Sequence, residues 1–116
     1  YQKWAFKAQS FVQSSPAVVD GAVYIGSFDT CLYSLDAQTG ALKWTYETEN
    51  AIDSSPSVAG GIVYVGSDDG TIYALNTETG KKQWEYKTGS EIDSSPSIVD
   101  GFLYVGSVDG KIYSLQ

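Results

Sequence analysis

Apolar and polar residues alternate over short runs of five or six residues, and Gly and Asp mark the breaks between the runs. One unit of this pattern contains, in order, the runs 44–48, 54–58, 62–67 and 71–75. These runs are rich in Val, Ile and Tyr, and they are too short and too β-branched for helices. Each run therefore predicts a strand, and the chain as a whole predicts an all-β fold.

The pattern repeats every 40 residues. The repeated positions are Trp4, Trp44 and Trp84; Pro16, Pro56 and Pro96; Tyr24, Tyr64 and Tyr104; and Gly26, Gly66 and Gly106. A period near 40 fits either a pair of helices or the four strands of a β-propeller blade. Because the runs predict strands, we expect three propeller repeats, at 4–43, 44–83 and 84–116.

Strands lettered A to D from the propeller axis outward follow the order D-A-B-C in each repeat. Ser-Ser-Pro-x-Val is the innermost strand A, and the Trp-bearing run is the outer strand D, so the chain opens on Tyr1 in an expected strand. Three blades are fewer than the four to eight of closed propellers. We expect strand D of one copy to complete the last blade of another, giving a six-bladed homodimer. The alternative is that the chain, which has no initiating Met, is part of a larger propeller.

Short turns, most of them containing Gly, join strand A to strand B and strand B to strand C of each repeat. Type I′ hairpins need positive φ at both central residues, which Asp tolerates and Gly accepts freely. We expect this turn at Asp20-Gly21, Gly60-Gly61, Asp100-Gly101, Asp69-Gly70 and Asp109-Gly110. At Asp29-Thr30 the β-branched Thr disfavours positive φ, which predicts a strained or different turn.

Composition excludes several classes of function. The net charge is −7, with seven Lys and no Arg, so a basic surface for nucleic acid is not expected. There is no His, and Cys31 is the only cysteine, which argues against zinc sites and His-dependent catalysis. No apolar stretch approaches the roughly 20 residues that cross a bilayer.

The segment between strands C and D carries a recognisable motif. It reads Ser34-Leu-Asp-Ala-Gln-Thr39-Gly40 before Trp44, and Ala74-Leu-Asn-Thr-Glu-Thr79-Gly80 before Trp84. This resembles the tryptophan-docking motif of the quinoprotein-like (pyrroloquinoline-quinone-like) β-propellers, over essentially the whole chain. The resemblance implies that each Trp lies across the Gly-bearing turn of a neighbouring blade. The implied docking residues are Trp4, Trp44, Trp84, Gly40, Gly80, Thr39, Thr79 and Ala74.

The same family includes quinone-dependent dehydrogenases as well as scaffold propellers such as an outer-membrane assembly lipoprotein. The dehydrogenases use a vicinal Cys pair, an Arg beside the quinone and a calcium ion held by acidic and amide side chains. One Cys and no Arg therefore favour a non-catalytic scaffold or binding module with no cofactor and no metal. The alternative is a fragment of a larger dehydrogenase whose catalytic residues lie elsewhere. The resemblance also implies an extracytoplasmic location.

Variable positions among the repeats predict where a partner would bind. The D-to-A and B-to-C connections of a propeller share one face, and Phe11, Phe28 and Val108 are apolar where solvent is expected. Asp68-Asp69 and Asp53 could suggest calcium, but the full loop pattern is absent and turn geometry explains Asp69. We expect Asp53 and Asp93 to bond backbone N–H groups of the D-to-A connection, and the alternative is that they line the mouth of the axial channel. The candidate face comprises Phe11, Phe28, Glu49, Asn50, Asp53, Asp68, Ser90, Glu91, Asp93 and Val108.

Overall fold

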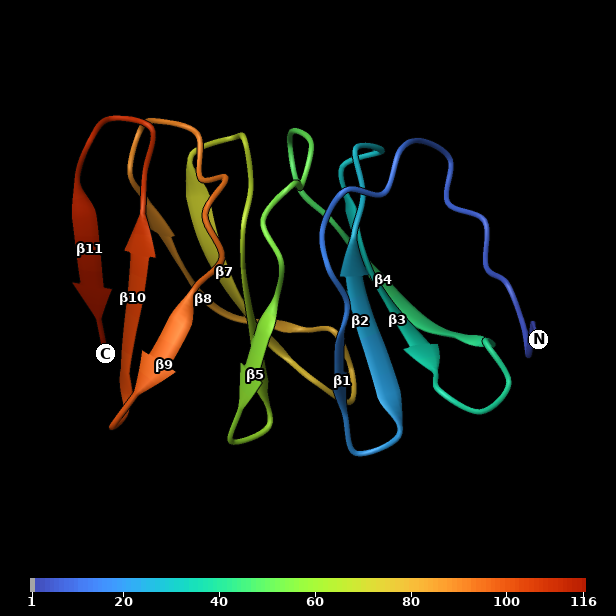
Figure 1. Cartoon of the computed structure of the whole chain (residues 1–116). Helices are drawn as coiled ribbons and strands as arrows, with labels where there is room; N and C mark the ends of the chain where they lie inside the picture. The colour runs from blue at the N-terminus through green and yellow to red at the C-terminus, as the bar shows by residue number, and fades with distance from the viewer. Residues whose placement is uncertain (1) are drawn as a thin grey trace.

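The structure, a computed structural model, describes residues 2–116 and shows three antiparallel sheets standing side by side (Figure 1). The first contains β1 (Ala17–Val19), β2 (Ala22–Gly26), β3 (Cys31–Asp36) and β4 (Leu42–Glu47). The second contains β5 (Ser57–Ala59), β6 (Ile62–Gly66), β7 (Thr71–Asn76) and β8 (Lys82–Lys87). The third contains β9 (Ser97–Val99), β10 (Phe102–Gly106) and β11 (Ile112–Leu115). The predicted all-β fold is confirmed.

Strand order within each sheet follows the chain. The two complete sheets run β1-β2-β3-β4 and β5-β6-β7-β8, and the third runs β9-β10-β11. The Trp-bearing strand is outermost, as expected: β4 pairs with β3, so that Trp44 lies opposite Ser34. The short strands β1, β5 and β9 contact one another in turn, which places them on the inner side of the row of sheets.

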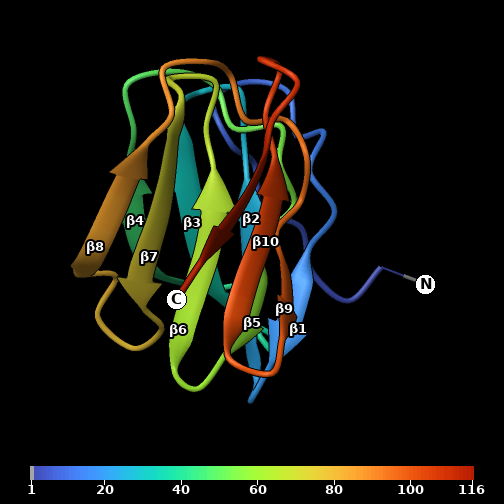
Figure 2. The same ribbon diagram turned by 90° about the vertical axis from the view of Figure 1, so that its left-hand side faces the viewer.

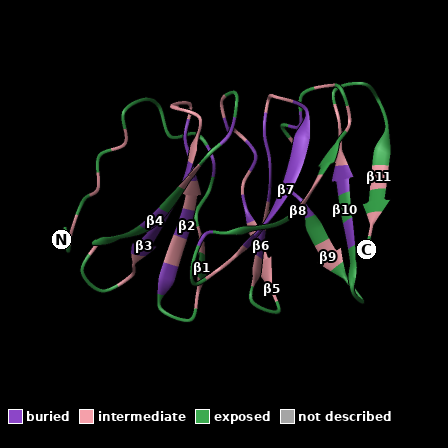
Figure 3. Cartoon of the chain, turned by 180° about the vertical axis from the view of Figure 1, so that it is seen from behind, coloured by how far each residue is buried: buried purple, intermediate pink, exposed green. Residues whose placement is uncertain are grey.

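The core lies between the sheets. Within a strand, successive side chains point to opposite faces, and both faces of the second sheet are covered (Figure 3). The first sheet contributes Ala22, Tyr24, Leu32 and Trp44, which pack against Val63, Val65, Tyr73 and Leu75 of the second. Leu103 and Val105 of the third sheet pack in the same way against Ile72. Each sheet therefore depends on its neighbours for burial.

Two of the predictions about strands need correction. Tyr1 lies outside the described residues, and residues 2–7 contain no strand, because an outer strand needs a strand C beside it and residues 2–116 supply none there. The innermost strands are also shorter than predicted: β5 begins at Ser57, after Pro56. Proline has no N–H to donate to a strand ladder, so pairing starts beyond it.

The predicted turns are partly right. Both central residues have positive φ at Asp20-Gly21, Gly60-Gly61 and Asp100-Gly101, as a type I′ turn requires. At Asp69-Gly70 and Asp109-Gly110 only the Gly has positive φ, so the type I′ prediction is wrong there. The Gly70 N–H donates to Ser67 O, closing a turn in which one left-handed residue suffices. Thr30 occupies that left-handed position in the first sheet with φ 82°, the predicted strain.

Candidate functional site

The candidate binding face is formed by two sets of connections at one end of the sheets (Figure 1). A backbone hydrogen bond joins the two connections in each repeat. Phe28 N–H donates to Phe11 O (2.8 Å), Asp68 N–H to Ala51 O (2.9 Å) and Val108 N–H to Glu91 O (3.0 Å). Because only backbone atoms make this bond, the side chains at these positions are free to differ. We call this surface the turn face.

An aromatic pair dominates the turn face at the first sheet. The rings of Phe11 and Phe28 meet edge to face with centroids 6.4 Å apart. Phe11 is 72% exposed although it belongs to a packed aromatic pair, and Phe28 is half-buried. At the third sheet Val108 is also exposed. The structure thus presents the three apolar residues of the predicted face to solvent at two separate places.

Carboxylates occupy the turn face between these places. Burial first, and then the charges of Asp53, Glu91 and Asp93, raise the pKa of Asp68 to about 6. Burial likewise raises the pKa of Asp53, with Asp93 the next cause. One oxygen each of Asp53 and Asp68 is buried and makes no hydrogen bond within residues 2–116. The structure brings these four predicted residues together as a group of uncompensated negative charge.

The remaining predicted residues of this face shape the connections. The Glu49 N–H donates to Asp69 Oδ2 (3.1 Å). Asn50 accepts a bond from Ala51 N–H through Oδ1 (2.7 Å), and the Ser90 N–H donates to Thr88 Oγ1 (3.3 Å). Glu49 and Asn50 are exposed and Ser90 is half-buried.

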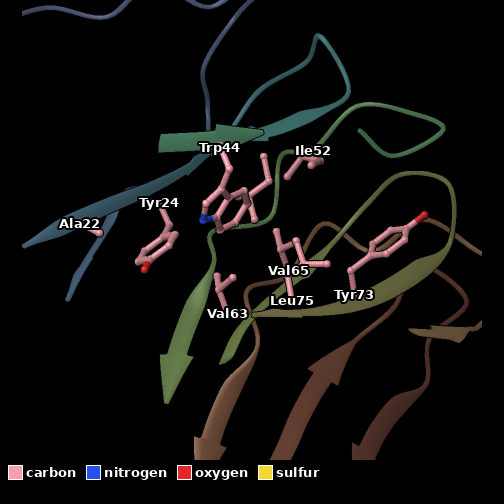
Figure 4. Packing of buried hydrophobic residues seen from close by; sticks show 9 residues of the cluster. Ala22, Tyr24, Trp44, Ile52, Val63, Val65, Tyr73 and Leu75 are labelled. Carbon is pink, nitrogen blue, oxygen red and sulfur yellow. The ribbon is translucent and has the colours of Figure 1, made fainter. Parts of the chain in front are cut away.

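Each Trp–Gly pair predicted from the motif is brought together. The Trp44 Nε1–H donates to Thr77 O at 2.9 Å, and a Cβ atom added to Gly80 would lie 2.6 Å from the Trp44 ring. Trp4 has the same relation to Ala37 O (2.9 Å) and to Gly40 (2.6 Å). Figure 4 shows Trp44 among Tyr24, Ile52 and Val63. Trp84 lies beside Tyr64 with ring centroids 6.0 Å apart, as Trp44 lies beside Tyr24.

The threonines and the alanine of the motif have local roles. Thr39 Oγ1 accepts from Ala41 N–H, and Thr79 Oγ1 accepts from Lys81 N–H, both at 3.2 Å. These bonds hold the turn that faces each indole. Ala74 is fully buried and lies opposite Trp84 on the neighbouring strand of the same sheet.

One repeated polar network was not anticipated. The Tyr73 hydroxyl donates to Asp69 Oδ2 (2.6 Å), while Asp69 Oδ1 accepts from Thr71 N–H (2.8 Å). Tyr33 donates to Asp29 in the same way, and Tyr113 donates to Asp109 at 2.9 Å. Burial and then the Asp69 contact raise the pKa of Tyr73. The spacing Asp-x-x-x-Tyr, repeated every 40 residues, was the available signal.

The sequence has a single cysteine, Cys31, and no arginine. Burial and then the charge of Asp29 raise the pKa of Cys31, which leaves its thiol protonated rather than nucleophilic. No group of three or more acidic or cysteine side chains in this range could hold a metal ion. Within the same range, no helix is long and apolar enough to cross a membrane. The residues therefore do not fit the Cys-pair, Arg and calcium set of quinone dehydrogenases.

The solved structures similar to the chain include BamB and quinohemoprotein dehydrogenases. BamB from Moraxella catarrhalis superposes with a TM-score of 0.86 at 27% identity, covering 98% of this chain and 36% of that protein. The quinohemoprotein alcohol dehydrogenase ADHIIG from Pseudomonas putida HK5 gives 0.83 at 28% identity, covering 94% of this chain and 19% of that protein. A europium-containing methanol dehydrogenase, at 22% identity and TM-score 0.75, shows the shared fold alone.

The chain thus spans about a third of the BamB structure and a fifth of the dehydrogenase. No curated protein matches the chain. The family model described as outer membrane protein assembly factor BamB matches residues 2–116. On the evidence of this match and of the three repeated sheets, the chain belongs to the BamB-type family of pyrroloquinoline-quinone-like β-propellers.

Proposed function

We propose that the chain is a non-catalytic propeller scaffold that associates head to tail with a second copy to form a closed ring of six blades. The observation that carries this proposal is an uncovered face on the third sheet (Figures 2 and 3). Phe102, Tyr104 and Ile112 are 39%, 40% and 82% exposed. The matching residues of the first sheet, Ala22, Tyr24 and Leu32, are at most 3% exposed, because the second sheet covers them.

The opposite end of the chain carries the complementary surface. An apolar groove of about 270 Å³ lies on the outer face of the first sheet, lined among others by Trp4, Phe6, Val12, Val23, Ile25 and Leu35. The matching residues of the second sheet, such as Val63, Val65 and Leu75, are fully buried against the first. The uncovered third-sheet face of one copy therefore suits the groove of another.

Heterologous surfaces of this kind form a ring when the rotation between copies closes. Two copies supply six blades, within the four to eight usual for propellers, whereas three copies would supply nine. Two copies are therefore the assembly that fits both the surfaces and the fold.

In this proposal the Trp–Gly contacts fasten consecutive blades. A Trp side chain buries 150–250 Å² and gains from a partner for its N–H, which Thr77 O gives Trp44 and Ala37 O gives Trp4. The turn face is where a further protein would bind, because Phe11 and Phe28 offer it an aromatic anchor beside carboxylates. By family resemblance, the scaffold works outside the cytoplasm.

Light scattering coupled to size exclusion tests the assembly. We expect one species at twice the 12.5 kDa chain mass. A monomer at micromolar concentration would overturn self-assembly and assign the uncovered faces to other blades of a longer protein.

The fragment-of-a-dehydrogenase alternative makes a separate prediction. Addition of pyrroloquinoline quinone with calcium should leave the melting temperature of the scaffold unchanged, because the chain has neither a Cys pair nor an Arg. A rise of several degrees that also perturbs the quinone absorbance would favour the alternative.

A further inference from the structure

We infer that residues 2–7 of one copy join β11 of its partner as the missing fourth strand of the third sheet, in one fixed register. Strand addition of this kind presupposes the self-assembly proposed above and names the segment that completes the blade. Both complete sheets show the register. Trp44 lies opposite Ser34, and Trp84 lies opposite Ala74. A further step of 40 residues leads from Ala74 to Ser114 and from Trp84 to position 124. In a ring of two copies, each with three repeats of 40 residues, position 124 is Trp4 of the partner subunit, so Ser114 would lie opposite it.

The same step fixes the other pairs. Cys31 faces Glu47 and Thr71 faces Lys87, so Lys111 would face Lys7 of the partner subunit. Ile112 would likewise face Phe6 of the partner subunit. Residues 2–7 thus have the positions of an outer strand, although in a single copy they contain no strand.

A glycine on the third sheet independently supports this junction. A Cβ atom on Gly26 would lie 2.3 Å from Ile52, and one on Gly66 would lie 2.1 Å from Ile92, so each glycine makes room for a side chain of the following connection. A Cβ atom on Gly106 would meet nothing closer than Ser94 Oγ at 3.5 Å. The residue that corresponds to Ile52 is Val12, which is 49% exposed. In the assembled ring, Val12 of the partner subunit covers Gly106.

A ladder of serines just before the inner strands β1, β5 and β9 gives a second, polar indication. The Ser15 N–H donates to Ser55 Oγ (2.7 Å), and the Ser55 N–H donates to Ser95 Oγ (3.0 Å). At one end of this series the Ser95 N–H is the next donor, and at the other end the Ser15 hydroxyl is the next acceptor. Joining the Ser95 N–H to Ser15 of the partner subunit repeats the same bond and closes the ladder around the axis.

The register can be trapped by a disulfide. The Thr88 N–H donates to Gly70 O, so residues 70 and 88 form a hydrogen-bonded pair, and the next pair, 71 with 87, is non-hydrogen-bonded. Lys7 and Lys111 occupy that second kind of pair, in which side chains lie close enough to cross-link. The variant combines Lys7→Cys and Lys111→Cys with Cys31→Ser to remove the native thiol. A matched control replaces Lys7→Cys by Lys3→Cys, which is about 13 Å out of register.

After mild oxidation, denaturing gels without reductant should show a covalent dimer at least about tenfold more abundant in the variant than in the control. Equal cross-linking in both would overturn the register. A dimer by light scattering that does not cross-link would also overturn the register while leaving self-assembly intact. A monomer by light scattering would instead contradict the self-assembly itself.

A charge reversal checks the junction without cysteines. Lys7 and Lys111 would face each other with like charge, which disfavours pairing. Lys111→Glu should therefore lower the dimer dissociation constant, by about tenfold over the two junctions, and adding Lys7→Glu should reverse the gain. Lys43→Glu changes the net charge equally at an exposed outer-strand position and should not tighten the dimer. No tightening by Lys111→Glu would overturn the pairing.

Discussion

Trp44 of the first sheet packs against Gly80 of the second so closely that a Cβ atom on the glycine would lie 2.6 Å from the indole. The same indole donates its N–H to Thr77 O, three residues before Gly80. The turn between β7 and β8 therefore meets the neighbouring sheet through one flat contact and one hydrogen bond. The glycine is needed at this point for the close approach of the ring as well as for its positive φ of 75°.

Gly80→Ala should lower the free energy of unfolding by about 2–4 kcal/mol, because the new methyl group displaces Trp44 and the alanine has a left-handed backbone. Gly61→Ala is the matched control. Gly61 has a similar φ of 78°, but a Cβ atom there meets nothing within 4 Å, so we expect a loss of only about 1 kcal/mol. Urea denaturation of both variants measures the difference. Equal losses would show that the Trp44 contact does not fasten the sheets.

The sequence predicted much of this arrangement, because the period of 40 residues identifies equivalent positions without any structure. Trp44 and Gly80 follow directly from that period and the motif. The late start of the inner strands could have been predicted from the prolines, which have no N–H to donate to a strand ladder. The absence of a strand at residues 2–7 did not follow, because pairing depends on which neighbours are present. The carboxylate group of Asp53, Asp68 and Asp93 was predicted residue by residue, but its mutual electrostatic effect needed the positions of neighbouring sheets.

Thr30 occupies a turn position whose backbone conformation is unfavourable for its side chain. Its φ of 82° costs a β-branched residue conformational energy, whereas Gly70 and Gly110 occupy the equivalent positions without strain. Thr30→Gly should raise the free energy of unfolding by about 0.5–1 kcal/mol, the strain relieved less the entropy that Gly adds to the unfolded chain. Asp20→Gly is the control, since Asp tolerates its φ of 51° and little gain is expected. Thermal denaturation would contradict the strain if Thr30→Gly lowered stability.

Ser34 is a second position at which the first two repeats differ. Its hydroxyl is fully buried between the first two sheets and has no hydrogen-bond partner within residues 2–116, while the equivalent residue of the second repeat is Ala74. Ser34→Ala should therefore stabilise the protein by about 1 kcal/mol, by removing a buried polar group that makes no bond. Ser27→Ala should destabilise it, because the equally buried Ser27 hydroxyl donates to Phe11 O at 3.0 Å. Denaturant titration of both variants should give opposite signs, and a loss of stability in Ser34→Ala would contradict the prediction.

The carboxylates of the turn face predict how stability changes with pH. Asp68 has a pKa of about 6 in the folded protein, above its ordinary value of 3.8, chiefly through burial and then through Asp53. Between those two values the folded protein binds the proton more tightly than the unfolded chain does. The free energy of unfolding should therefore rise as the pH falls from 7 to about 4.5, by about 1 kcal/mol after solvent screening. Below about pH 4 it should fall, because the pKa values of Asp29 and Asp109 are lowered in the folded state.

Asp68→Asn isolates this effect, because the amide has nearly the same shape and no charge. It should stabilise the protein by about 1 kcal/mol at pH 7 and flatten the rise between pH 6 and 4.5. Asp20→Asn removes one negative charge from an exposed hairpin, away from the carboxylate group, and should leave the rise in place. Unfolding curves at pH 7, 6, 5 and 4.5 compare the two variants with the parent chain. An unchanged slope in Asp68→Asn would show that Asp68 does not take up the proton, and a parent chain that steadily loses stability over this range would contradict the sign of the prediction.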